Sequence, residues 1–479
     1  MATAAKEKTV HTSTITPIFK QQKKMSIALR NEDIDDRKQR LKKIKKWVLD
    51  HRTDIQKAVY QDFKKPPEEV DLSEIYAVLT EVRHAIKHLH NWMKPKKVEA
   101  PLSLLGTKSR VVYEPKGVCL IIAPWNFPFN LAIGPLISAL AAGNTVMLKP
   151  SELTPHTSQL IEDMINELFE PAEVAVFQGG KEIAQSLLAL PFDHIFFTGS
   201  PQVGKIVMKA AAEHLTSVTL ELGGKSPVIV DETANIPDAA EKIIWGKLLN
   251  KGQTCIAPDY VLVHQEVKES LIDEMKVYID KLFDDEGKGI KESSQYARII
   301  NEQHFNRIHE LIDQAVDLGA EIELGGETDI EECFIHPTLL RNVPKEATIM
   351  EEEIFGPVLP LVKFRDLTEA ISYINSKPKP LALYIFSQTR SNQENIIKQT
   401  SSGTVAINDN ILQFMHPELP FGGVNNSGIG KSHGHFGFLA FSNEKAVLKQ
   451  KIGLTSVKPI YPPYNSIAKN AIELLLKYF

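Results

Sequence analysis

Short apolar runs alternate with longer amphipathic segments along the middle of the chain. The apolar runs have the length of buried strands, and the segments between them have the spacing of helices. This alternation predicts an α/β fold with a doubly wound parallel sheet, because crossover helices join parallel strands and bury both faces of the sheet. Strands are expected at 117–123, 145–149, 174–177, 194–198, 218–220 and 228–230, and helices at 131–142, from 155 onward, at 182–189 and at 200–214.

The first hundred residues are predicted to be mainly helical. Apolar residues spaced by three and four form a stripe between Tyr76 and Leu89, and Pro95 ends the helical signal. An earlier helix carries the basic run RKQRLKKIKK at 37–46. We interpret this run as a solvated helix face, with contact to anionic lipid or nucleic acid as the alternative.

Both ends of the chain differ in character from the middle. The polar residues before Met25 predict a disordered tail. Residues 102–114 predict a hairpin that turns near Gly106, and 446–449 predict a strand. The last segment, 467–479, is an amphipathic helix too short to span a membrane. We expect it to dock on the body of the protein, the alternatives being that it covers a substrate mouth or touches a membrane surface.

Composition limits the class of protein. The chain has 479 residues, of which 43% are hydrophobic and 24% charged, with a net charge of −5. These values exclude a mostly disordered chain, a collagen and a disulfide scaffold, and the length predicts about three folding units. The chain has 3 cysteines, and so sparse a number favours a reducing compartment, so we expect a cytoplasmic protein with free thiols.

A glycine-containing turn follows the expected strand at 194–198. It runs from Gly199 to Gly204 as GSPQVG, so the first and third glycines of G-x-G-x-x-G are present and Pro201 replaces the second. Ser200 can cap the next helix, whose free N–H groups would face a pyrophosphate. The alternative is an ordinary capped helix, and the missing glycine argues against a dinucleotide bound in the usual Rossmann manner.

Three polar residues are candidates for catalysis. Cys255 follows small polar neighbours on a loop and could present a thiolate, whereas Cys119 and Cys333 have apolar neighbours and are interpreted as packing residues. Glu221 ends a strand between two leucines, where desolvation would raise its pKa toward that of a general base; the alternative is pairing with Lys225. Asn126 could donate to an oxyanion or simply stabilise a turn between prolines.

Seven motifs, in order along residues 25–465, resemble those of the aldehyde dehydrogenase superfamily. The order and length of the matches make the resemblance specific, and GQTCIAPDYV with the PPY tail is most similar to the class 3 branch, which oxidises fatty and aromatic aldehydes. The motifs are APWNFP (123–128), KPSE (149–152), FTGS (197–200), LELGGKSP (220–227), GQTCIAPDYV (252–261), EIFGPV (353–358) and PFGGVNNSGIG (420–430).

The resemblance implies a role for each site residue. Cys255 would be the nucleophile, Glu221 the base that activates water, and Asn126 with the Cys255 N–H the oxyanion hole. The cofactor, NAD or NADP, would contact residues drawn from four of the motifs and Gly204, which ends the glycine turn; Pro201 is part of the family pattern and creates no conflict. The cofactor-binding residues implied are Trp125, Lys149, Glu152, Gly199, Ser200, Gly204, Glu353 and Phe355. No metal is implied, and His433 and His435 are interpreted as loop histidines.

The resemblance also implies a domain plan with a Rossmann-like cofactor domain, an α/β catalytic domain and a small β oligomerisation element. A homodimer is expected, with a small aldehyde as substrate and no nucleic-acid partner. Two alternatives to hydrolytic aldehyde oxidation remain: acyl transfer to coenzyme A, and a catalytically silent binding protein. The expected boundaries are 1–24 (tail), 25–97 and 115–222 (cofactor domain), 223–415 (catalytic domain), 98–114 and 416–460 (oligomerisation) and 461–479 (C-terminal tail).

Overall fold

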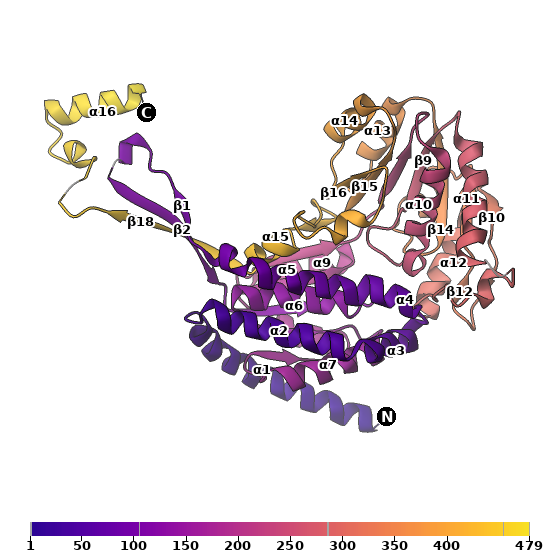
Figure 1. Ribbon diagram of the computed structural model, residues 1–479, viewed down its shortest axis with the longest axis horizontal. Coiled ribbons are helices and arrows are strands. Elements are labelled where there is room, and N and C mark those ends of the chain that lie inside the picture. Colours follow the sequence, from indigo (N-terminus) through magenta and orange to yellow (C-terminus); the bar gives the residue numbers. More distant parts are fainter. Residues whose placement is uncertain (1, 105, 285–286, 454, 479) are drawn as a thin grey trace.

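The computed structural model describes residues 2–104, 106–284, 287–453 and 455–478. Two α/β lobes lie side by side, and a narrow β arm extends away from them (Figure 1). Each lobe is built on one predominantly parallel sheet. The α/β class predicted from the alternation of strands and helices is therefore confirmed.

The sheet of the first lobe has the order β17-β7-β6-β3-β4-β5. Five of its strands run parallel, and β17 pairs antiparallel with β7 at the edge. Alternate side chains of β3 enter different cores, since Cys119 and Ile121 join one cluster and Val118 and Leu120 the other. The strands are β3 (Val118–Ile122), β4 (Thr145–Lys149), β5 (Val174–Val176), β6 (His194–Gly199), β7 (Ser217–Leu222) and β17 (Gly428–Ile429).

Helices cover both faces of this sheet. One face holds α2 (Ile34–Asp50), α3 (Arg52–Phe63), α4 (Pro67–Val70), α5 (Tyr76–Met93), α6 (Asn130–Ala142), α7 (Pro155–Leu168) and α15 (Gly434–Ala440), with a π-helical turn, η1, at Asp71–Ile75. The other face holds α1 (Ala2–Leu29), α8 (Lys181–Leu188) and α9 (Pro201–Ala212). The sheet is thus covered on both faces, as its uniformly apolar strands require.

The second lobe carries the order β10-β13-β14-β9-β8-β15-β16, with only β10 antiparallel. Its two faces are covered by α10 and α11 on one side and α12, α13 and α14 on the other. The strands are β8 (Pro227–Val230), β9 (Tyr260–His264), β10 (Glu321–Leu324), β13 (Thr338–Arg341), β14 (Val358–Phe364), β15 (Ala382–Phe386) and β16 (Thr404–Ile407). The helices are α10 (Ile236–Leu248), α11 (Lys268–Phe283), α12 (Glu302–Asp317), α13 (Leu367–Asn375) and α14 (Arg390–Gln399).

Short elements connect these layers. A two-stranded ribbon pairs β11 (Thr328–Asp329) with β12 (Phe334–Ile335). Helical turns occur at η2 (Leu102–Leu104), η3 (Leu249–Gly252), η4 (Ile290–Glu292), η5 (Thr348–Met350), η6 (Leu412–Met415) and η7 (Lys458–Ile460).

The arm is a three-stranded antiparallel sheet. Its strands are β1 (Lys96–Val98), β2 (Thr107–Pro115) and β18 (Ser442–Gln450), in the order β1-β2-β18. The strand predicted near 446–449 is confirmed within β18. The predicted hairpin is shifted, because its first strand is β1 and residues Leu102–Leu104 form η2.

The boundary between the first lobe and the arm differs from the prediction for the chain after residue 415. The resemblance implies that residues 416–441 belong to the oligomerisation element, but β17 joins the first sheet and α15 packs on α5 and α6. The part that belongs to the arm begins at Ser442. The reason is that the Gly-rich segment and α15 carry apolar side chains such as Phe438 that complete the core of the first lobe.

The tail before Met25 is not disordered, and this prediction is wrong. Helix α1 spans Ala2–Leu29, and Ile15 and Phe19 are buried against β3 and its neighbours. The Gln22 amide is also buried and donates to the Val146 carbonyl at 2.8 Å and the Pro171 carbonyl at 3.0 Å. The buried positions of α1 are spaced by four and three residues, as on one face of a helix. Two of them, Gln22 and Ser26, are polar, so the sequence does not show a continuous apolar stripe.

The basic run on α2 is partly structural. Leu41, Ile44 and Val48 are buried as the spacing predicts. Arg37 is buried too, and its guanidinium donates to the carbonyls of Ala141 and Ala142 at 3.2 and 2.9 Å. A cation at this position stabilises the C-terminal end of α6, where carbonyls lack helical partners. The remaining lysines lie toward solvent, in agreement with a solvated face.

The C-terminal helix α16 (Ser466–Tyr478) does not dock on the body of the chain, contrary to the prediction. Ala468 is its one buried residue among those described, and Ile467 and Leu474 are exposed. The helix stands near the tip of the arm (Figure 1). Across the described residues, no helix is both long enough and apolar enough to cross a membrane.

Candidate active site

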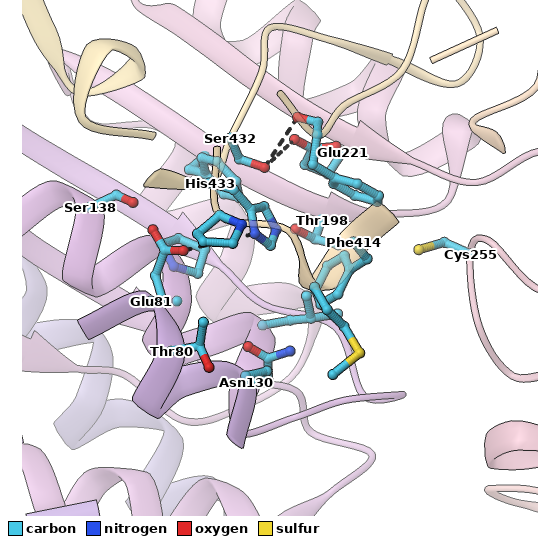
Figure 2. Close-up of a pocket in the computed structure, with 18 of the residues that line it drawn as sticks. Thr80, Glu81, Asn130, Ser138, Thr198, Glu221, Cys255, Phe414, Ser432 and His433 are labelled. Atoms are coloured by element: carbon cyan, nitrogen blue, oxygen red, sulfur yellow. Dashed lines mark hydrogen bonds and ion pairs between the residues drawn. The ribbon is translucent and has the colours of Figure 1, made fainter. Parts of the chain in front are cut away.

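The candidate catalytic residues meet in a pocket between the two lobes. Glu221 ends β7 of the first lobe, and Cys255 comes from a loop of the second lobe. Both side chains line the same pocket, with Glu221 and Ser432 on one side and Cys255 on the other (Figure 2). A second, wider cavity continues from Cys255 past Asn126 toward α9. The three candidate catalytic residues therefore lie around one space.

The loop that presents Cys255 is shaped by three consecutive left-handed residues. Asn250, Lys251 and Gly252 have φ values of 50°, 58° and 72°. This conformation is unfavourable for residues with a Cβ, so tertiary contacts must hold it. A Cβ at Gly252 would lie 2.3 Å from the Gly356 carbonyl oxygen, so only glycine fits there. The sequence shows the glycine but gives no signal for the two left-handed residues before it.

Asn126 is buried beside this loop. Its side-chain amide donates to the carbonyl of Gln253 at 3.0 Å, two residues before Cys255. Its backbone carbonyl accepts from the Asn250 amide at 2.8 Å and from the Lys65 ammonium at 3.2 Å. Asn126 and Cys255 line the same cavity, so the Asn126 amide is placed where it could donate to an oxyanion formed there.

Lys65 and Glu74 form a buried ion pair behind Asn126. The Lys65 ammonium lies 3.2 Å from a Glu74 carboxylate oxygen, and both side chains are inaccessible to solvent. The second carboxylate oxygen of Glu74 accepts from the Asn130 backbone N–H at 2.7 Å. This pair was not identified from the sequence, because its partners lie on a loop and on η1 and match no motif. The Lys65–Glu74 pair helps to position the backbone of Asn126.

We expect Lys65→Met to destabilise the protein by about 3–5 kcal/mol. The substitution leaves the Glu74 carboxylate buried without its cation and removes a donor from the Asn126 carbonyl. Urea unfolding followed by circular dichroism measures the loss. The double variant Lys65→Met/Glu74→Leu should recover most of it, because no unpaired charge remains. A single variant as stable as the wild type would contradict the structural role of the pair.

Glu221 is held in a nearly dry environment. Its side chain is 6% exposed, and one carboxylate oxygen accepts from the Ser432 hydroxyl at 2.8 Å. Within the described residues its other oxygen has no hydrogen-bond partner. Burial raises the pKa of Glu221 to about 8, partly opposed by Ser432 and the Lys431 cation. The alternative pairing with Lys225 is wrong, because Lys225 pairs with Asp259 instead.

The surroundings of Cys255 oppose loss of the thiol proton. Burial raises its pKa, and the nearby carboxylates of Glu353 and Glu221 raise it further. A proton acceptor is therefore needed before the sulfur can attack, since the thiolate is the nucleophile. Cys119 is fully buried in β3, and Cys333 packs partly against the core of the second lobe, so Cys255 is the cysteine that faces the pocket.

Glu353 and Phe355 lie on a loop at the far side of the wider cavity, and hydrogen bonds hold this loop in place. Arg307 donates to the carbonyls of Glu353 and Ile354, at 3.2 and 2.5 Å. Phe355 has a φ of 50° and its ring meets that of Trp125 edge-on, with centroids 5.4 Å apart. Burial raises the pKa of Glu353 to about 8, and the Asp259 charge adds to the shift. The two rings contact each other edge to face and form one apolar wall of the wider cavity, which Cys255 also lines.

The two ends of the glycine turn have different structural roles. Gly199 and Ser200 line the wider cavity, and the Ser200 hydroxyl caps α9 by accepting from the Val203 N–H at 3.3 Å. Gly204 does not line it; a Cβ there would lie 2.7 Å from the Leu222 side chain, so this glycine lets α9 pack closely on β7. The third glycine of a dinucleotide turn has this packing function.

Lys149 and Glu152 lie at the carboxyl end of β4. The Lys149 ammonium donates to a Glu152 carboxylate oxygen at 2.8 Å and to the Pro150 carbonyl at 3.1 Å. Neither residue is among those that line the wider cavity. The cavity itself fits a nicotinamide dinucleotide, because its walls combine the aromatic rings of Trp125 and Phe355, the start of α9 and the basic side chain of Lys205.

Sequence reasoning missed a second polar group in the pocket. Glu81 on α5 accepts from the Gly434 N–H at 2.8 Å, and its other oxygen lies 3.9 Å from His433 Nδ1. Burial raises the pKa of Glu81 to about 7 and lowers that of His433 to about 4. Figure 2 shows both beside Ser432, at the end of the pocket away from Cys255. Glu81 lies within an amphipathic helix, which gave no signal of its burial.

Known proteins match this sequence and this fold closely. The model of the aldehyde dehydrogenase family matches residues 4–447, and the chain belongs to this family. Its members' reaction is the oxidation of aldehydes, and the chain is accordingly an oxidoreductase that uses NAD or NADP.

Two relatives and two solved structures show how close the similarity is. The chain is 46% identical to 4,4'-diaponeurosporen-aldehyde dehydrogenase of Staphylococcus aureus, over 90% of this chain and 93% of the relative. It is 41% identical to aldehyde dehydrogenase family 3 member F1 of Arabidopsis thaliana, over 94% and 92%. The class 3 resemblance is thereby confirmed.

The fold agrees equally well. Substrate-bound Staphylococcus aureus AldH superposes with a TM-score of 0.91 at 44% identity, covering 96% of this chain and 99% of that one. The aldehyde dehydrogenase of Mycobacterium tuberculosis complexed with NAD⁺ gives a TM-score of 0.81 at 27% identity, covering 89% and 87%.

Proposed function

We propose that the protein oxidises apolar aldehydes, medium- or long-chain aliphatic or aromatic, to carboxylic acids through a covalent thioester on Cys255. The pocket between Glu221 and Cys255 carries the proposal. Apart from a few polar groups, its walls are apolar side chains from both lobes. An apolar tail gains free energy from burial there, at about 25 cal/mol per Å² of apolar surface. The apolar lining includes Leu131, Pro135, Phe196, Leu222, Leu381, Phe414, Met415 and Phe421.

The first chemical step forms the C–S bond. Cys255 gives its thiol proton to solvent water, and the Sγ thiolate attacks the aldehyde carbon, so that the C=O π electrons move to the oxygen and it becomes an alkoxide. The Asn126 amide and the Cys255 backbone N–H are the donors for that oxygen, so charge develops against preorganised dipoles. Trp125, Gly199, Ser200, Glu353 and Phe355 would hold NAD or NADP, which would supply the acceptor for the hydride of this carbon. An acyl thioester on Cys255 remains.

The second step releases the acid. Glu221 removes a proton from water, the hydroxide adds to the thioester carbon, and the C–S bond breaks to return the thiolate. Glu221 suits this role because it borders the pocket and the wider cavity and has an unpartnered oxygen. Acyl transfer to coenzyme A would not need this base. The presence of Cys255, Glu221 and Asn126 around the wider cavity also argues against a catalytically silent binding protein.

A kinetic screen tests the proposal. Aldehydes of graded chain length and aromatic aldehydes are supplied with NAD and with NADP, and reduced cofactor is followed by absorbance. We expect continuous turnover without coenzyme A, with KM falling as the apolar tail lengthens. A single stoichiometric burst relieved only by coenzyme A would overturn hydrolysis, and no reaction with any aldehyde would support a silent scaffold.

Two residues are proposed to choose between the cofactors. Lys149 and Glu152 contact the adenosine ribose, and Glu152 decides whether a 2′-phosphate is accepted. Comparing kcat/KM of the wild type and of Glu152→Ala, each with NAD and with NADP, tests this.

The oligomeric state and the location of the enzyme are also proposed. The arm pairs two chains as a homodimer, since Val98 and Leu448 on it are exposed. The sparse free thiols support a cytoplasmic location.

Deletion of residues 466–479 tests the role of α16. The helix stands at the arm, away from the two lobes (Figure 1), and none of its residues lines the pocket, so we expect KM for short and for long aldehydes to stay unchanged in the truncated chain. Steady-state kinetics with a matched pair of aldehydes measures this. A rise in KM for the long aldehyde alone would mean that the helix reaches the pocket of a second chain. Lost binding to vesicles would instead indicate a membrane contact.

A further inference from the structure

A cluster of metal-binding side chain types lies at the rim of the substrate pocket, apart from the catalytic residues. His84 and His88 are one turn apart on α5, and Glu418 lies on the segment that follows η6. One ligand atom from each lies within 4.8 Å of the other two. Histidines four positions apart on a helix present their rings on one face, so both can reach the same ion.

His84 supplies the strongest observation. Its side chain is only 9% exposed, and its Nε2 has no hydrogen-bond partner among the described residues. The nearest acceptor is a Glu418 carboxylate oxygen at 3.5 Å, which exceeds a good hydrogen bond. A buried nitrogen without a partner costs free energy unless something binds it.

The surroundings fix both imidazoles. The rings of His84 and His88 have centroids 4.4 Å apart, and the Trp92 ring lies 5.4 Å from that of His84. A Cβ at Gly434 would lie 3.3 Å from His84 Cδ2 and Nε2, so the start of α15 also packs against this ring. The ring of His84 therefore has little freedom to turn its nitrogen elsewhere.

We propose that His84, His88 and Glu418 bind a divalent transition metal ion of the Zn²⁺ type. Two imidazoles and one carboxylate are typical ligands of Zn²⁺, whereas Mg²⁺ and Ca²⁺ prefer oxygen ligands alone. Water would complete a tetrahedral site. The three ligand atoms lie within 4.8 Å of one another, so binding one ion requires His88 and Glu418 to turn toward His84.

The site would join two parts of the pocket rim. Thr80, one turn before His84 on α5, lines the pocket, and so do Met415 and Pro417, just before Glu418. A metal bound by ligands from both segments ties them together. The inference concerns this rim and is independent of the chemistry on Cys255, because none of the three ligands belongs to the catalytic group.

Metal titration tests the proposal. The full chain with Cys255→Ser, so that the catalytic thiol does not compete, is freed of any affinity tag, treated with chelator and titrated with Zn²⁺ by calorimetry. We expect one ion per chain. Adding His88→Ala or Glu418→Gln should weaken binding at least about tenfold, since a lost ligand costs no less than a lost outer-shell partner. These two residues are chosen because substitution of the more buried His84 could disturb folding.

His90→Ala is the matched control, because His90 is an exposed histidine on the same helix outside the cluster. It should bind Zn²⁺ like the parent. Co²⁺ in place of Zn²⁺ should give the visible absorption of a tetrahedral site in the parent and the control, and lose it in both ligand variants. No binding by the parent, unchanged affinity in either ligand variant, or equal loss in the control would each overturn the proposal.

Discussion

Cys255→Ser abolishes aldehyde oxidation in our expectation, lowering kcat/KM by about four orders of magnitude or more. A serine hydroxyl remains protonated at neutral pH, and it would face the same two carboxylates that already oppose ionisation of the cysteine. Covalent attachment of the substrate then fails, and with it the step that exposes the hydride. The measurement is steady-state production of reduced cofactor with an apolar aldehyde.

The other two cysteines serve as controls. Cys119→Ala and Cys333→Ser should keep the wild-type kcat/KM per folded molecule, because Cys119 lies inside β3 and Cys333 packs on the second lobe away from the pocket. Alanine is used at 119 so that no hydroxyl is buried without a partner. Wild-type activity in the Cys255 variant, or loss of activity in both controls, would refute the assignment of the nucleophile.

Glu221→Gln should slow release of the acid by about 10²–10⁴-fold while leaving attack by Cys255 possible. An amide cannot accept the proton of water, so the contribution of a general base is lost. The acyl thioester should therefore accumulate. Rapid mixing should show a burst of reduced cofactor equal to the enzyme, and mass spectrometry of the quenched protein should find the acyl group on Cys255. A full steady-state rate in this variant would contradict the role of Glu221.

The pH dependence of the wild type should report the same group. Its pKa is raised to about 8 by burial, so the base form is scarce at pH 6.5 and predominant above pH 8. The hydrolytic rate should rise with pH over this interval and level off above it. Glu221→Gln should lose this rise, whereas Ser432→Ala, which removes the hydroxyl that stabilises the carboxylate, should move it to higher pH.

A stability measurement separates this chemistry from a folding effect. The folded-state pKa of Glu221 lies above its unfolded value near 4.5, so the folded protein binds the proton more tightly. Stability from this group is present below pH 4.5 and is lost as the pH rises to about 8. Glu221→Gln should therefore melt like the wild type near pH 5 and a few degrees higher at pH 9.

Local patterns were sufficient to predict much of the framework. The Ser200 cap, the apolar strands at 118–122 and 145–149 and the stripe on α5 depend on neighbours within a few residues, which the sequence displays directly. The catalytic residues were harder. Their local context left each of Cys255, Glu221 and Asn126 with an ordinary alternative, and only the set of motifs connected them to one reaction.

Long-range contacts account for what the sequence did not reveal. Lys65 meets Asn126, and Ser432 meets Glu221, across 61 and 211 residues of chain. A residue without a motif carries no mark of such a partner. The helix before Met25 was missed for the related reason that Gln22 is buried by hydrogen bonds to distant carbonyls, so that its polarity suggested solvent.

The return of the chain from β17 to β18 has a consequence for folding during synthesis. Thr107–Pro115 pair with Ser442–Gln450 in an unbroken nine-residue register, and α15 completes the core begun by α5 and α6. These contacts span over three hundred residues, the kind of non-local pairing that slows folding. When the first lobe emerges from the ribosome, one edge of its sheet is therefore unpaired and part of its core is uncovered. That lobe stays incomplete until the whole second lobe has been made, and during this interval the exposed edge of β7 is vulnerable to mispairing.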